Sequence, residues 1–149
     1  MTNFSIGFTG LDEQDPFVAL GELTLGEDRE HFGSVLGFWG VNDYEESWLA
    51  ALRRLVSGAS ISCLATSVID PSNANFLEVW PLYREERDVY VQNSLIFPDQ
   101  LSREFNPAAP WESVDPRSVV DEDGQMISEW RISLDDIREF LESNSLSRS

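Results

Sequence analysis

One segment of the chain, residues 42–57, has the apolar repeat of a helix that packs on a core, and this limits the folds open to the rest. Its apolar side chains recur three or four positions apart and form a single stripe: Tyr44, Trp48, Ala51, Leu52 and Leu55. Asn42 and Glu45 have the spacing of a capping box at its start, and Ser57-Gly58 ends it. Such a helix needs a partner layer that covers one face only.

The three runs after this helix have the composition of β-strands. Residues 59–69 are rich in β-branched and small side chains, and residues 75–84 and 88–97 flank the acidic turn Glu85-Glu86-Arg87. Strands joined by short turns pair antiparallel. Because proline has no N–H to donate, Pro81 predicts an edge strand or a bulge in the middle run.

The N-terminal part predicts less regular structure. Residues 3–8 and 17–25 are short runs of mixed apolar and polar character, and Gly21 indicates an edge strand with an irregularity. We expect a turn at residues 12–16, which contain Asp and Pro, and a loop at residues 26–40.

The C-terminal part predicts one more strand and one more helix. Residues 98–116 contain several prolines and are expected to be a loop, whereas residues 125–132 alternate as a strand. Ser133 with Asp136 caps a final helix, whose end at residues 143–149 we expect to fray. The predicted fold class is α+β, a mainly antiparallel β-sheet packed against two or more α-helices in a single domain of residues 1–149.

The charge of the chain points to the kind of partner it binds. Asp and Glu number 27 against 10 Lys and Arg, all of them Arg, which gives a formal net charge of −17. A field of this sign repels nucleic acid and anionic lipid, and it speeds encounter with a basic protein. We therefore expect a basic protein partner, with no nucleic acid and no membrane. The lack of a visible secretion signal or long apolar run predicts a cytoplasmic protein.

Residues for catalysis or metal binding are scarce. His31 and Cys63 are the only His and Cys, so no zinc set exists in the sequence. Cys63 alternates with Ile61 and Ala65, which is typical of a small buried side chain in a strand. Asp121-Glu122-Asp123-Gly124 lacks the alternating ligands of a calcium loop. We expect no enzyme, no cofactor and no metal.

The central strands resemble a known family. The runs SCLATSVIDPSNANF at residues 62–76, VWPLYR at 79–84 and VYVQNSL at 89–95 resemble immunity proteins of bacterial contact-dependent growth inhibition systems. Flanking blocks at residues 38–48 and 119–132 are similar to the same family, so the resemblance covers residues 35–142 and leaves out 1–34. It implies a cytoplasmic antidote that binds the C-terminal toxin domain, often a basic nuclease, delivered by a neighbouring cell, and keeps it inactive.

The candidate toxin-binding residues are polar and aromatic positions of the strand region and of two acidic turns: Asp70, Asn73, Glu78, Trp80, Tyr83, Arg84, Glu85, Glu86, Asp121, Glu122 and Asp123. For the strand residues two interpretations stay open. They could form a polar face that contacts the toxin, or they could maintain the fold through hydrogen bonds to the backbone of loops. The acidic loops at residues 12–15 and 27–30 are equally good contact candidates. Charge would set the encounter rate and a few aromatic or Arg anchors the affinity.

Two other functions stay open from the sequence. The same negative field suits a nucleic-acid mimic that inhibits a host nucleic-acid-binding protein. A hydrolase that works through paired carboxylates is the least supported, because turns and helix starts are where solvated acids ordinarily lie.

Overall fold

The computed structural model describes residues 3–70 and 75–148 and contains two antiparallel sheets and two helices. The first sheet has the order β1-β2-β3, with β1 Phe4–Asp12, β2 Asp15–Leu25 and β3 Asp28–Val35. The second has the order β4-β5-β6-β8, with β4 Ile61–Ser67, β5 Leu77–Glu85, β6 Asp88–Gln92 and β8 Glu129–Ser133; β7, Ser94–Ile96, also pairs with β5. The helices are α1, Val41–Val56, and α2, Leu134–Arg148. The predicted α+β class is confirmed.

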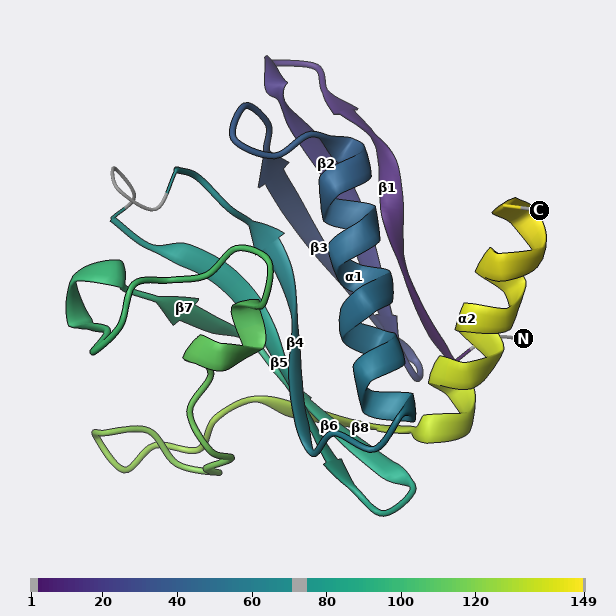
Figure 1. Ribbon diagram of the computed structural model, residues 1–149, viewed down its shortest axis with the longest axis vertical. Helices are drawn as coiled ribbons and strands as arrows, with labels where there is room; N and C mark the ends of the chain where they lie inside the picture. The colour runs from purple at the N-terminus through teal and green to yellow at the C-terminus, as the bar shows by residue number, and fades with distance from the viewer. Residues whose placement is uncertain (1–2, 71–74, 149) are drawn as a thin grey trace.

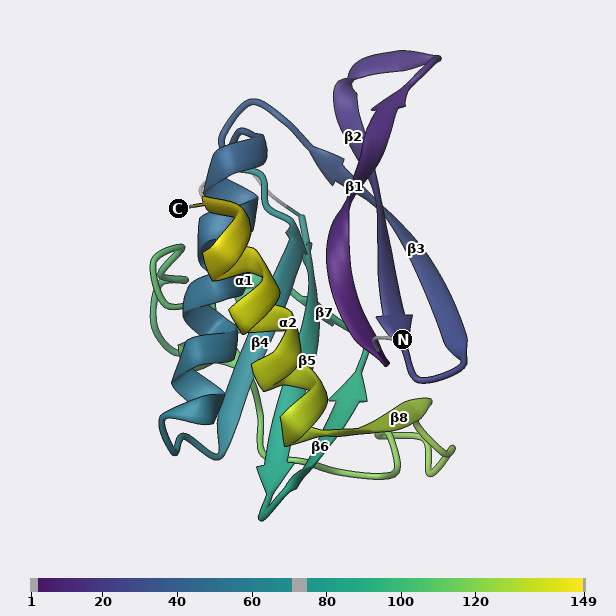
Figure 2. The same ribbon diagram turned by 90° about the vertical axis from the view of Figure 1, so that its right-hand side faces the viewer.

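The two sheets and two helices enclose one core. Helix α1 packs on β4 and against α2, while α2 contacts β1 and β3 contacts β4. Figures 1 and 2 show the helices on one side and the β1–β3 sheet standing beside them as a separate twisted layer. The core includes large buried side chains from every layer, among them Phe4, Leu23, Tyr44, Leu64 and Ile137.

Helix α1 buries the predicted apolar stripe, but its N-cap is Gly40, two residues before the predicted cap Asn42. The Gly40 N–H donates to Asp43 Oδ2 at 2.8 Å, so Asp43 takes the role that the sequence assigned to Glu45. The prediction of an Asn42 cap is therefore wrong. The predicted end is confirmed, because Ser57 is the C-cap and Gly58 has the positive φ of 120° that glycine accommodates.

Two side chains of α1 tie the sheets to the helix. The Tyr44 hydroxyl donates to the Val35 carbonyl at 2.6 Å and accepts the Val68 N–H at 2.9 Å, so it joins the ends of β3 and β4. The Trp48 indole donates to the Ala65 carbonyl at 2.8 Å. These bonds satisfy polar groups that would otherwise be buried without a partner.

The N-terminal sheet differs from the sequence prediction in two ways. Residues 28–35, expected within a loop, form β3, because Phe32 and Ser34 alternate into the core while polar neighbours face outward. Strand β2 is central, between β1 and β3, and not an edge. The irregularity predicted at Gly21 is confirmed as a register shift between Phe8 and Gly10 on the opposite strand.

Pro81 lies in a central strand, so its assignment to an edge is wrong. Strand β5 pairs with β4 along one side. Along its other side, residues 82–85 pair with β6 and residues 77–79 pair with β7. The same register would place Pro81 opposite Gln92 and Trp80 opposite Asn93, and both pairs are missing at the point where proline has no N–H to donate. The strand predicted over residues 88–97 is thereby split into β6 and β7.

The chain between β7 and β8 is mostly irregular, as predicted. It has short 3-10 turns at Pro98–Gln100 and Pro110–Ser113, and a hairpin in which Val120 bridges Met126. Strand β8 begins only at Glu129, four residues later than predicted. The cap of α2 is confirmed, since the Ser133 N–H donates to Asp136 Oδ2 at 3.2 Å. Fraying of residues 143–149 stays a prediction.

No helix among the described residues is long and apolar enough to cross a membrane.

Candidate protein-binding groove

The irregular segment at residues 113–122 lies over the outer face of the second sheet and is held there by side chains of the strands. The Tyr83 hydroxyl donates to the Asp115 carbonyl at 2.8 Å, and the Gln92 side-chain amide donates to the Ser118 carbonyl at 2.9 Å. Burial of the Tyr83 ring raises the pKa of its hydroxyl to about 12, and the nearby Asp115 carboxylate adds to this. These two hydrogen bonds hold the segment against β5 and β6.

Arg117 is the strongest of these attachments. Its Nε donates to Glu129 Oε2 at 2.8 Å and its Nη2 to Glu129 Oε1 at 2.6 Å. The guanidinium lies 3.9 Å from the centre of the Tyr90 ring, and its Nη1 is 3.6 Å from Glu85 Oε1. The paired guanidinium lowers the pKa of the Glu129 carboxyl. Both side chains are mostly buried, so this two-bond pair fixes the segment to β8.

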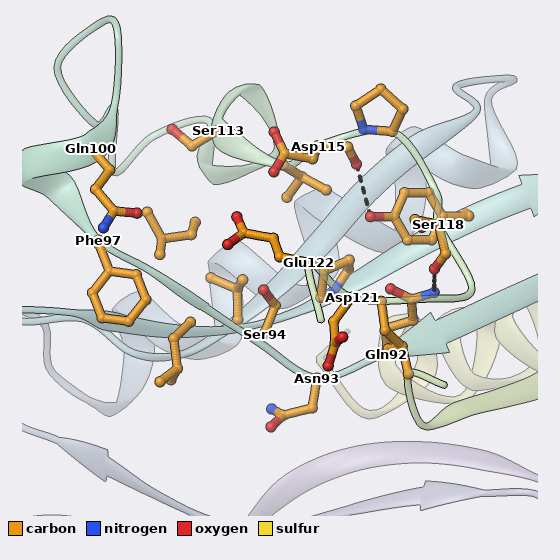
Figure 3. A pocket seen from close by; sticks show the side chains of 18 of the residues that line it. Gln92, Asn93, Ser94, Phe97, Gln100, Ser113, Asp115, Ser118, Asp121 and Glu122 are labelled. Atoms are coloured by element: carbon orange, nitrogen blue, oxygen red, sulfur yellow. Dashed lines mark hydrogen bonds between the residues drawn. The ribbon is translucent and has the colours of Figure 1, made fainter. Parts of the chain in front are cut away.

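A groove of about 800 Å³ separates this segment from β7 and the outer face of β5. Its floor includes Val79, Pro81 and Tyr83. In Figure 3, Phe97 and Gln100 lie at one end of the groove. The groove is lined by β5, β6 and β7 of the second sheet and by the irregular chain between β7 and β8.

The charges on the walls of the groove have one sign. Asp115, Asp121 and Glu122 are the only charged side chains among the described residues that line it. Figure 3 shows the Glu122 carboxylate directed into the groove between the Asp115 side and the Ser94 side. The nearest fixed cation in the segment, Arg117, is already paired with Glu129 and Glu85. The groove therefore presents an uncompensated negative wall to solvent.

The strand on the other side of the groove is β7. Five consecutive residues, 93–97, line the groove, so it runs along the edge of β7 and not over one face of the strand. Ser94 pairs with Val79 of the groove floor, whereas Leu95 pairs with Glu78, so the exposed side chains of Leu95 and Phe97 project to the other face of the sheet. The apolar surface inside the groove is its floor together with Val120 on the hairpin, and it suits an occupant that has both apolar and cationic groups.

The structure brings only part of the predicted site to this groove. Tyr83, Asp121 and Glu122 line it. Asp123 lies beside them at the tip of the hairpin, where its N–H donates to Asp121 Oδ1 at 2.9 Å. These residues come from β5 and from a loop about 40 positions later, and the folding of residues 113–122 onto the sheet unites them.

Three other predicted residues make contacts within the fold. Glu78 Oε1 accepts from the Thr66 hydroxyl at 2.7 Å, and Arg84 Nη1 donates to the Leu55 carbonyl at 2.5 Å. Trp80 is 4% exposed, and its ring centre lies 5.8 Å from that of Trp130. These contacts favour the interpretation that the three residues maintain the fold, and a role in binding stays a prediction.

The remaining predicted residues lie away from the groove lining. Glu85 is the last residue of β5, and Glu86 lies in the turn between β5 and β6 with a φ of 57°. Asp70 is exposed after the end of β4, and Asn73 lies outside the described residues. Their role as toxin contacts is an untested prediction.

The sequence prediction missed Ser94, Leu95, Phe97 and Asp115 as surface residues of one groove. A weak signal was present, because the polar Asn93 lies in the middle of the strand predicted over residues 88–97. In the structure this residue separates β6 from β7. Asp115 carried no signal, since its place depends on how the loop folds back.

The scarce reactive residues form no catalytic arrangement in the described part of the chain. His31 lies in β3 and not in a loop, with Nε2 3.5 Å from Glu22 Oε2 at the surface. Cys63 is fully buried, as predicted, and burial raises the pKa of its thiol. No group of three or more His, Cys, Asp or Glu that could hold a metal occurs among the described residues.

Comparison with known proteins decides the family. Residues 34–140 match the family model of the CdiI N-terminal domain. The chain belongs to this family of immunity proteins of contact-dependent growth inhibition systems. The immunity protein CdiI of Enterobacter cloacae subsp. cloacae is 34% identical over 121 residues, which are 81% of this chain and 83% of that protein. The resemblance seen at residues 35–142 is thus confirmed.

A solved CdiI structure shares the fold as well. The toxin and immunity complex CdiA-CT/CdiI from Enterobacter cloacae matches with a TM-score of 0.84 and 32% identity, over 94% of this chain and 97% of that one. This coverage is too high to omit residues 1–33, so the β1–β3 sheet, which precedes the CdiI family match, is at least partly shared. The groove lining, from Val79 to Ile127, lies wholly within the CdiI match.

Proposed function

We propose that this CdiI-family chain binds the toxin domain of its own growth inhibition system and neutralises it by covering the surface that the toxin uses. The observation that carries the proposal is the match, at 32% identity and over nearly the whole chain, to a protein solved in a complex of toxin and immunity protein. The toxin is proposed to be basic, and a nuclease is the activity that a basic surface suits best, because such an enzyme must attract phosphate.

The charge of the chain supports this partner. A net charge of −17 gives a long-range attraction to a cationic domain, which raises the association rate of two proteins towards about 10⁸–10⁹ M⁻¹s⁻¹ at low salt. Fast capture matters for an antidote, since a catalytic toxin does damage for as long as it is free. The proposed site of action is the cytoplasm, where an incoming toxin domain meets its targets.

The proposed mechanism is one-to-one occlusion without a reaction. The groove holds carboxylates but, within the described residues, neither a nucleophile with a base beside it nor a metal-binding cluster. An inhibitor of this kind acts through the area and complementarity of the surface it buries.

Co-expression tests the proposal. The toxin domain encoded beside this chain's gene is induced in a laboratory strain with and without the chain, and growth is followed. We expect growth arrest with the toxin alone and full growth with both, whereas a chain that fails to restore growth at equal expression would contradict the proposed function. An unrelated acidic protein of similar net charge serves as the control and is expected not to protect.

A further inference from the structure

The groove along β7 has the features of a recognition surface that is more specific than the acidity of the whole molecule. Its negative wall consists of Asp115, Asp121 and Glu122, and no Arg is among the described residues that line it. The acidic turn between β5 and β6 lacks this combination. That turn contains Arg87, and Glu85 beside it faces Arg117.

The apolar surface inside the groove adds what charge alone cannot supply. Val79 and Pro81 form its floor, and Val120 on the hairpin side is 42% exposed. Exposed apolar side chains of this kind, in a concave site rimmed by polar groups, mark protein interaction surfaces. Desolvated apolar contacts slow dissociation, while rim charges mainly speed association.

The wall positions are also fixed before any partner binds. Asp115 is held through its carbonyl by Tyr83, and the adjoining chain by Gln92 and by the paired Arg117. A site whose walls need no ordering loses less entropy on binding. Such a wall can hold its carboxylates at set distances from the apolar floor of the groove.

We propose that this groove is the toxin-contacting surface, and that it takes an extended segment of the toxin that has Arg or Lys beside an apolar side chain. The basic groups meet Asp115, Asp121 and Glu122, and the apolar side chain contacts Val120 and the floor at Pro81. This inference rests on the proposed function and assigns its binding energy to one surface of the chain.

Charge-neutral variants test the negative wall. Asp115→Asn with Glu122→Gln removes two exposed carboxylates from the groove, and Glu139→Gln with Glu142→Gln removes two exposed carboxylates from α2 as the control pair. Binding to the purified toxin domain is measured by stopped flow at low salt. We expect association to slow about tenfold for the groove pair and by less than about twofold for the control pair.

A second pair of variants tests the apolar surface of the groove. Val120→Ser is compared with Leu11→Ser, since Leu11 is 58% exposed on β1 of the other sheet. We expect the complex of the Val120 variant to dissociate about tenfold faster and that of the Leu11 variant to dissociate as the parent does. Urea unfolding of all four variants checks that the fold is unchanged.

Hydrogen exchange of the unmutated complex gives a readout that depends on no variant. We expect slowed exchange at residues 93–97 and 113–122 on binding. If the chain protects cells but these segments exchange as before and groove and control variants behave alike, the groove assignment is overturned and the proposed function stands. If the chain neither binds the toxin nor protects, both are overturned.

Discussion

Arg117 and Glu129 connect the irregular segment that forms one wall of the groove to the edge strand β8, through two hydrogen bonds on a single carboxylate. The two residues are 12 positions apart, and the hairpin at residues 120–126 lies between them. The pair therefore closes a loop and sets where Asp115 and Glu122 stand relative to β7.

Replacement of Arg117 by Lys should destabilise the protein, because an ammonium group cannot make the two parallel bonds of a guanidinium. We expect a loss of about 1–2 kcal/mol in the free energy of unfolding, measured by urea denaturation. Arg138→Lys is the control, since the Arg138–Asp135 pair is exposed, and its effect should be below about 0.5 kcal/mol. Equal effects of the two changes would contradict the role given to Arg117.

The same pair predicts a dependence of stability on pH. The pKa of Glu129 is lowered in the fold, first of all by its hydrogen bonds with Arg117. Its contribution is fully present above the unfolded value, about 4.3, and is lost as the pH falls through the lower folded value. The difference in unfolding free energy between the parent and Glu129→Gln should be largest near neutral pH and shrink below pH 4. A difference that does not change with pH would argue against this ion pair.

The Tyr44 hydroxyl should matter more than its size suggests. Tyr44→Phe leaves the Val35 carbonyl and the Val68 N–H without their bonds in a buried site, which costs about 1–3 kcal/mol. Tyr90→Phe keeps the ring under Arg117 and removes a hydroxyl for which no bond is seen in the described residues, so it should change stability by less than about 0.5 kcal/mol. Thermal or urea unfolding compares them, and a neutral Tyr44→Phe would contradict the bridging role.

Cys63 should report on global unfolding. Its side chain is fully buried in β4, and burial raises the pKa of the thiol. In the folded state a reagent therefore cannot reach the sulfur, and the reactive thiolate form is disfavoured. We expect no reaction with a thiol reagent at pH 8 in buffer and one equivalent of reaction in denaturant. Prompt labelling of the native protein would show that β4 opens locally or that this part of the core is wrong.

Elements with strong local periodicity were predictable from the sequence. The α1 stripe, the end of α1 at Gly58 and the cap of α2 at Ser133 depend on residues three or four apart, which the sequence displays directly. The start of α1 was missed because glycine is a weaker signal than Asn42, although Asp43 reaches back to Gly40.

Features that depend on distant partners were not predictable. Strand β3 has few large apolar residues, and it is a strand because β2 pairs with it and because Phe32 packs on the core. Its short apolar pattern gave too little signal. The groove needed the fold of residues 113–122 over β5, which is held by Tyr83, Gln92 and Arg117, and no local pattern encodes such contacts.

Titration of the purified toxin domain with this chain tests the central claim most directly. Toxin activity is measured on its own substrate as the chain is added, and the complex is sized by light scattering. The account predicts a linear fall that reaches zero at one equivalent, with both proteins recovered intact. Loss of activity at a small fraction of an equivalent, which would mean turnover, or activity unchanged at excess chain would contradict it.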